Sequence, residues 1–101
     1  MSANNINIPL VEGKYLMYKD RPLVREGDTI CYGDLTEPYI LVMEIMSYKQ
    51  ENGERLPDAI IVQVVESEDQ NKIVRQGTKN GLYEAFGYGI IWLEQALKSD
   101  M

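Results

Sequence analysis

Histidine is missing from this 101-residue sequence, and cysteine occurs once, as Cys31. Without imidazole the chain lacks the commonest general base and the commonest metal ligand. A single cysteine forms no internal disulfide and cannot complete a zinc site built from cysteine and histidine. Cys31 lies in a β-rich apolar run and is interpreted as a structural thiol. We therefore predict no catalytic residue, no metal ligand and no cofactor.

Positive charge is also scarce. The chain has 10 Lys and Arg residues against 16 Asp and Glu residues, for a formal net charge of −6. This balance disfavours nucleic acid and anionic membranes as partners. The sequence has no apolar signal-peptide core after a basic N-terminus, and no apolar run that could span a membrane. We expect a cytoplasmic protein, since a lone thiol suits a reducing compartment.

Carboxylates are the groups left for acid–base or metal chemistry. Those in residues 51–58 and 66–69 lie in polar loops without the spacing of a calcium loop, and we interpret them as solvated. Glu44 lies within an apolar run, and two placements stay open for it. It either points to solvent or is buried beside a partner such as Arg75 or Lys72. Only a buried, perturbed carboxylate would be a candidate site.

Residues 81–98 form the one long segment with the hydrophobic period of an amphipathic helix. Gly87 and Gly89 each cost about 1 kcal/mol relative to alanine inside a helix. We favour one helix over two shorter ones, because the apolar residues stay in phase across the glycines. Tyr88 and Ile91 interrupt the polar side and are candidate interface residues. The side predicted to be buried contains Leu82, Tyr83, Phe86, Ile90, Leu93 and Leu97.

The rest of the chain predicts short strands. They cover residues 14–19, 23–25, 29–32, 39–48, 59–65 and 72–76, with the first turn at 20–22 and a link to the helix at 77–79. Asn52-Gly53, between the two strongest strands, is preferred in type I′ hairpin turns. If that turn sets the register, the pairs are Leu41 with Val64, Met43 with Val62, and Ile45 with Ile60. Pro57 falls in this ladder and predicts a bulge or an early end.

These elements predict the α+β class. We expect an antiparallel, curled sheet of five or six strands in a meander, with one C-terminal helix packed across it. Residues 1–8 are polar and without period, and are predicted to be a flexible tail. Residues 9–101 are predicted to form a single domain.

The second face of the main hairpin is a candidate interface, because it is more apolar than a solvated sheet face needs to be. Its residues are Ile40, Val42, Met46, Ile61 and Val65. If the sheet curls into a barrel, this face is an outer wall that stays partly wet. If the sheet stays open, a partner must cover the face, and a two-fold homodimer is the commonest solution.

A basic, tyrosine-containing group near the N-terminus is a candidate ligand or nucleic-acid face. It consists of Lys14, Tyr15, Tyr18, Lys19, Arg21 and Arg25. Acidic residues in the same region cancel its charge, so nucleic acid is disfavoured. We expect a small, non-catalytic interaction or regulatory domain that binds a protein partner or a second copy of itself. The alternative is a small-ligand or nucleic-acid binding module that uses a tyrosine-lined sheet face.

Overall fold

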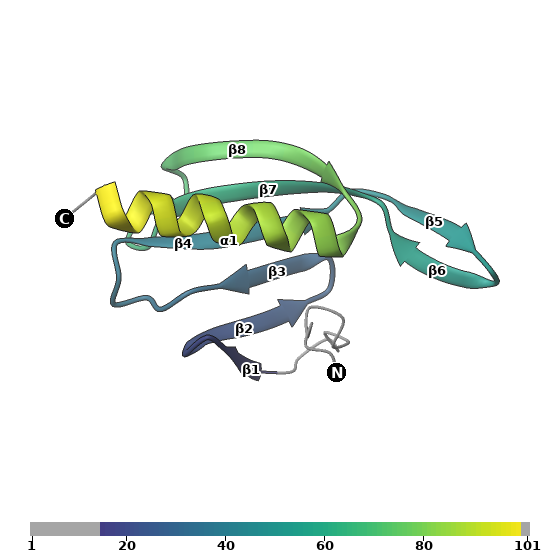
Figure 1. Ribbon diagram of the computed structural model, residues 1–101, viewed down its shortest axis with the longest axis horizontal. Helices are drawn as coiled ribbons and strands as arrows, with labels where there is room; N and C mark the ends of the chain where they lie inside the picture. The colour runs from purple at the N-terminus through teal and green to yellow at the C-terminus, as the bar shows by residue number, and fades with distance from the viewer. Residues whose placement is uncertain (1–14, 100–101) are drawn as a thin grey trace.

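The computed structural model describes residues 15–99 (Figure 1). The predicted tail over residues 1–8 lies outside the described residues. Strands come first along the chain and the helix last. The elements are β1 (Tyr15–Tyr18), β2 (Arg21–Glu26), β3 (Thr29–Tyr32), β4 (Tyr39–Ile45), β5 (Tyr48–Glu51), β6 (Glu54–Pro57), β7 (Ala59–Glu66), β8 (Ile73–Asn80) and α1 (Leu82–Ser99).

The predicted α+β architecture is confirmed. Six strands form one antiparallel sheet in the order β1-β2-β3-β4-β7-β8, and β5 and β6 form a small second sheet. In Figure 1, α1 lies across one face of the main sheet, while the β5–β6 hairpin extends beyond it. Within the described part of the chain, β1 and β8 are the two edges of an open sheet, so the six strands do not close into a barrel.

The register predicted from Asn52-Gly53 is confirmed. Leu41 pairs with Val64, Met43 with Val62 and Ile45 with Ile60. The same register continues into the small sheet, where Tyr48 pairs with Pro57 and Glu51 with Glu54. Between the two sheets the ladder is interrupted at residues 46–47 and 58. The early end of the main ladder therefore falls beside Pro57, which has no N–H to donate.

The predicted strand over residues 39–48 is broken at residues 46–47, and two further predicted boundaries in the sheet were wrong. The first turn lies at Lys19-Asp20, with φ angles of 50° and 67°, and β2 begins before Pro22. Two successive positive φ angles are what a tight two-residue hairpin requires, and Asp tolerates them. The second correction concerns β8, which continues to Asn80 instead of ending at residue 76. Pairing with β7 holds the extra residues in extended form, down to the pair Ala59–Asn80.

One continuous helix covers the sheet, as predicted. Phe86 is 3% exposed and Leu93 is fully buried, over the equally buried Leu41 and Val62. Gly89 is also buried, and a Cβ added to it would lie 2.8 Å from both terminal methyl groups of Leu41. Absence of a side chain at position 89 thus lets the helix axis approach β4 and β7 closely.

The face of the sheet opposite α1 is less apolar at its surface than predicted. Ile40 and Val65 are buried, although they lie on that face. Ile40 packs under the backbone of Gly33, whose positive φ of 142° brings the β3–β4 loop back over the strand. Val42 and Ile61 are half-buried, and Met46 is exposed in the break between the two sheets. The open face therefore presents only part of the apolar area that the sequence predicted.

Candidate interaction surface

The side of α1 that points away from the sheet carries large apolar side chains in solvent. Tyr83 is 66% exposed, Ile91 52% and Tyr88 44%. At about 100° per residue, Ile91 lies about 160° around the helix from both Gly89 and Leu93, which face the core. Ile91 is therefore at the crest of the solvent side. The outer face of α1 is defined here by Tyr83, Glu84, Gly87, Tyr88 and Ile91.

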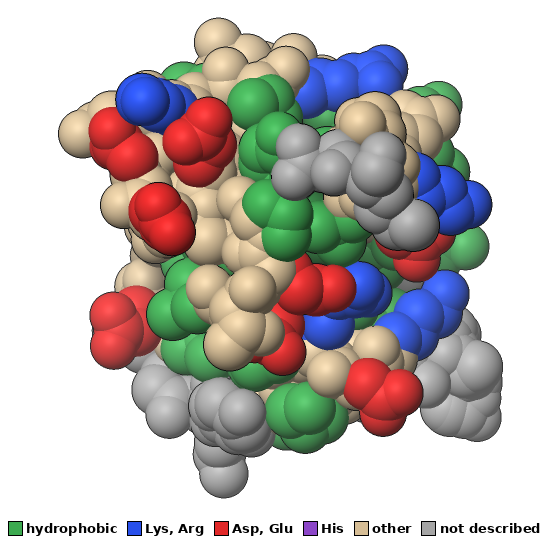
Figure 2. Space-filling model, turned by 90° about the vertical axis from the view of Figure 1, so that its left-hand side faces the viewer, with side chains coloured by type: hydrophobic (Ala, Val, Ile, Leu, Met, Phe, Trp, Pro, Cys, Tyr) green, Lys and Arg blue, Asp and Glu red, His purple; other side chains and the backbone are tan. Residues whose placement is uncertain are grey.

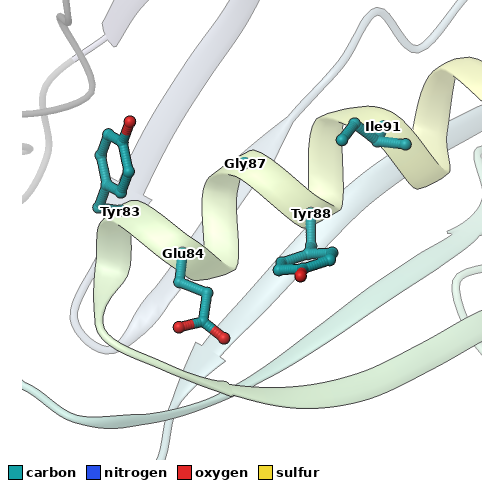
Figure 3. A pocket seen from close by; sticks show the side chains of 5 residues that line it. All are labelled: Tyr83, Glu84, Gly87, Tyr88 and Ile91. Atoms are coloured by element: carbon teal, nitrogen blue, oxygen red, sulfur yellow. The ribbon is translucent and has the colours of Figure 1, made fainter.

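A depression of about 550 Å³ lies on this outer face and is lined by its five residues. Figure 3 shows Tyr83 and Ile91 on either side of Gly87, with Glu84 and Tyr88 pointing to the other flank. A Cβ added to Gly87 would meet nothing within 4 Å. The floor of the depression is thus bare helix backbone, and its walls are two tyrosines, one isoleucine and one carboxylate.

Strand β8 orders one flank of the outer face. The ammonium of Lys79 lies 3.8 Å from the centre of the Tyr88 ring, and the guanidinium of Arg75 lies 4.6 Å from the Trp92 ring. Arg75 also donates a hydrogen bond of 3.0 Å to the side-chain oxygen of Gln95. Exposed cation–π contacts are worth about 0.5–1 kcal/mol each. They restrict the Tyr88 and Trp92 rings, so this flank is a defined surface.

Charged residues lie in the first and last turns of α1, and Glu94 lies between them. Glu84 lies in the first turn and Lys98 in the last turn, where each complements the helix dipole.

Figure 2 shows the end of the molecule that lies on the left in Figure 1. Lys and Arg side chains lie mainly in the right-hand half of this view, with Asp and Glu side chains between several of them. The basic residues visible from this side therefore form no continuous tract.

The two predicted interface residues of the helix come together, since Tyr88 and Ile91 line the same depression. The predicted interface residues of the sheet do not join them. They lie on the opposite side of the sheet from α1, where Ile40 and Val65 are already buried by their own chain. The structure thus separates the predicted interface into a helix part and a sheet part. Met46 is the exposed residue of the sheet part, whereas the two predicted residues of the helix part lie together and are both exposed.

The basic, tyrosine-containing group is dispersed. Lys14 and the side chain of Tyr15 lie outside the described residues. The Tyr18 ring packs in the core, 5.4 Å from the Phe86 ring, and the Lys19 ammonium lies 5.7 Å from the Tyr18 ring. Arg21 binds Glu37, and Arg25 donates hydrogen bonds to the Gly27 carbonyl and the Tyr48 hydroxyl. In the described residues, these side chains make local contacts within the fold, and the half-buried Tyr18 ring packs against the Tyr32 and Phe86 rings.

Glu44 and Cys31, the two chemical candidates from the sequence, lie on the face of the sheet opposite α1. Glu44 is exposed and accepts a hydrogen bond from the Thr29 hydroxyl at 3.0 Å, so the solvated placement is correct and the buried one is wrong. Burial, followed by the charges of Glu26 and Glu44, raises the pKa of the Cys31 thiol. A raised pKa keeps the thiol protonated and unreactive at neutral pH. Among residues 15–99, no three Cys, Asp or Glu side chains converge on a common metal position.

Sequence reasoning missed two residues of the outer face. Tyr83 was placed on the buried side, but its ring points away from Glu84 and Tyr88 into solvent (Figure 3). It lies at the margin of the apolar arc, where a tyrosine can keep its ring wet. Gly87 was read only as a weak point of the helix. The signal for both was present in the spacing, because Tyr83, Gly87 and Ile91 recur every four residues.

Comparison with known proteins adds no identification. The chain matches no family model, no curated protein and no solved structure. None of the helices described is long and apolar enough to cross a membrane.

Proposed function

We propose that this chain is a small, non-catalytic interaction module and that the outer face of α1 is its contact surface. The observation that carries the proposal is the exposure of Tyr83 and Ile91 on either side of the open backbone at Gly87. Tyrosine is enriched at protein interfaces and among the residues that dominate binding energy. A depression walled by such residues on a rigid helix suits a protruding side chain of a protein partner.

The scaffold supports this role. The inner side of α1 is anchored by Phe86 and Leu93, so the outer side is presented without any need to fold on binding. A surface ordered in advance loses less conformational entropy when a partner docks. The absence of histidine from the sequence remains the reason for a non-catalytic assignment. The single thiol favours a reducing compartment, and we propose the cytoplasm.

Affinity capture with three matched baits tests this proposal. The wild-type chain and Ile91→Glu are used as baits in an extract of the native host, with Ile73→Glu as control. Ile73 is 44% exposed but lies on β8, outside the outer face. We expect partners, including the chain itself, that the wild-type and control baits retain and Ile91→Glu loses. Identical retained sets for all three baits would refute the proposal.

A further inference from the structure

The solvent side of α1, which contains the outer face and continues to Lys98, carries a charge pattern that is complementary to itself. Glu84, Ile91 and Lys98 are seven residues apart, in the first turn, the middle and the last turn of α1. Positions one heptad apart differ by about 20° around an α-helix, so the three share one stripe along the solvent crest. The stripe is acidic at one end, apolar in the middle and basic at the other end. Turning it end over end about Ile91 brings its acidic end onto its basic end.

This helix can pack antiparallel against a second copy of itself in two registers. In the first, Ile91 of each copy enters the Gly87 depression of the other, but this register places Glu84 opposite Glu94 of the second copy. In the second, Ile91 lies on the two-fold axis, and Glu84 faces Lys98 of the second copy at both ends. Like charges directly opposed are destabilising and opposite charges are favourable. Charge therefore selects the second register.

We infer that the partner of the outer face is a second copy of this chain, packed antiparallel through α1 with Ile91 on the two-fold axis. The inference rests on the proposed function and names its partner. The stripe winds slowly around its helix, so two copies keep their stripes in contact when the helix axes cross at a shallow angle of about 20°. The interface is isologous and closes on itself, so it yields dimers and no larger assembly.

The depression fits the residue that this register brings to it. Helical side chains lean toward the N-terminus of their own helix. In an antiparallel pair, Lys98 of the second copy leans from Glu84 toward Gly87 and Tyr88. Its aliphatic stem lies over the bare backbone at Gly87, where there is room for it. Its ammonium meets the Glu84 carboxylate on the flank that carries the Tyr88 ring, an environment that favours a cation on an apolar stem.

The size of the contact sets the expected affinity. Stable interfaces bury about 1,200–2,000 Å² in total, whereas a single pair of helices lies at or below the small end of that range. The dimer is therefore weak and depends on concentration at micromolar levels and above. Its charge pairs are exposed, so added salt weakens it further.

Sedimentation equilibrium of charge-reversal variants tests the partner and the register together. Glu84→Lys leaves positive charge at both ends of the stripe, and Lys98→Glu leaves negative charge at both ends. We expect each single variant to raise the dimer dissociation constant at least about tenfold. An equimolar mixture of the two variants should associate at least as well as wild type, because each end of the hetero-pair then joins opposite charges. Circular dichroism of each variant serves as the control for a retained fold.

Each outcome decides one point. A wild-type chain that stays monomeric at all concentrations overturns the inference, and the proposed function then stands if Ile91→Glu still loses a different protein partner. A wild-type dimer that neither charge reversal weakens overturns this register. Single variants that fail to associate and a mixture that recovers association support it. Unchanged association of Ile91→Glu would overturn both the inference and the outer face as the contact surface.

Discussion

The two faces of α1 use the same residue type in opposite ways. Gly89 faces the core, where an added Cβ would lie 2.8 Å from Leu41 and 3.2 Å from Val62. Gly87, two residues earlier, faces solvent, where an added Cβ would touch nothing. Each glycine costs about 1 kcal/mol of helix stability relative to alanine. Close packing of the helix on the sheet offsets that cost for Gly89, but nothing within the described chain offsets it for Gly87.

Folding accounts for one face of α1 and leaves the other unexplained. The inner face is explained by folding alone, since its side chains are buried and their spacing follows the helical period. The outer face carries Tyr83, Ile91 and a glycine whose cost the fold does not offset. Features that cost stability without improving packing are expected at functional sites. The contrast between the two faces is the basis of the proposed contact surface.

Truncation of an apolar side chain should cost far more stability on the inner face of α1 than on its outer face. Leu93→Ala should lower the free energy of unfolding by about 2–5 kcal/mol, because Leu93 is fully buried and its loss leaves a cavity. Ile91→Ala should change it by about 0.5 kcal/mol or less at protein concentrations too low for association. Urea unfolding of both variants measures the comparison. Equal losses for the two would show that the outer face also belongs to the core.

The two glycines should respond to alanine with opposite signs. Gly89→Ala should destabilise by about 1–2 kcal/mol, since the clash with fully buried Leu41 outweighs the gain in helix propensity. Gly87→Ala should stabilise the monomer by about 0.5–1 kcal/mol, because its Cβ enters open space. Thermal unfolding at low concentration compares the two variants with wild type. A destabilised Gly87→Ala would contradict the open depression on the outer face.

The smallest expected change in stability concerns the Arg21–Glu37 ion pair, a surface contact that belongs to neither face of α1. Arg21 donates two hydrogen bonds to Glu37, at 2.8 Å and 3.0 Å, and this contact lowers the pKa of the Glu37 carboxyl. A carboxyl whose pKa is lower in the folded chain than in the unfolded chain stabilises the fold at pH values above its unfolded pKa of about 4.3. This stabilisation is lost as the pH falls through the pKa of the folded chain. Glu37→Gln should therefore cost at most about 1 kcal/mol at pH 7, as the pair is partly exposed.

Unfolding of Glu37→Gln at several pH values checks the sign of this linkage. The difference from wild type should shrink as the pH falls below about 4, where both chains lack the carboxylate. A difference that grows in acid would show that Glu37 acts through some contact other than its ion pair with Arg21.

Local chemistry was sufficient to predict the centre of the fold. Asn52-Gly53 fixed the register of β4 with β7, and the phase of apolar residues across Gly87 and Gly89 predicted one helix. Both signals act over short distances in the sequence. The register of a strand pair determines which side chains share a face. One correctly predicted turn therefore placed six core residues on the buried face.

Other features depend on contacts that local chemistry does not contain. The length of β8 is set by its pairing with β7. The Trp92 ring packs so closely on β8 that a Cβ added to Gly77 would lie 2.9 Å from it. Burial of Ile40 depends on the return of the β3–β4 loop at Gly33. The Tyr83 ring, at the margin of the apolar arc, is 66% exposed in the packed structure. Each of these requires the packed structure.

Disulfide cross-linking at Ile91 is the sharpest test of an antiparallel contact between two copies of α1. Ile91→Cys is introduced into a Cys31→Ser background, and Tyr83→Cys in the same background is the control. A disulfide needs Cβ atoms about 3.5–4.5 Å apart, and only a residue on the two-fold axis meets its own copy at that distance. Under mild oxidation we predict a covalent dimer for Ile91→Cys and monomer for Tyr83→Cys. Equal cross-linking of the two variants, or none for Ile91→Cys, would contradict the account.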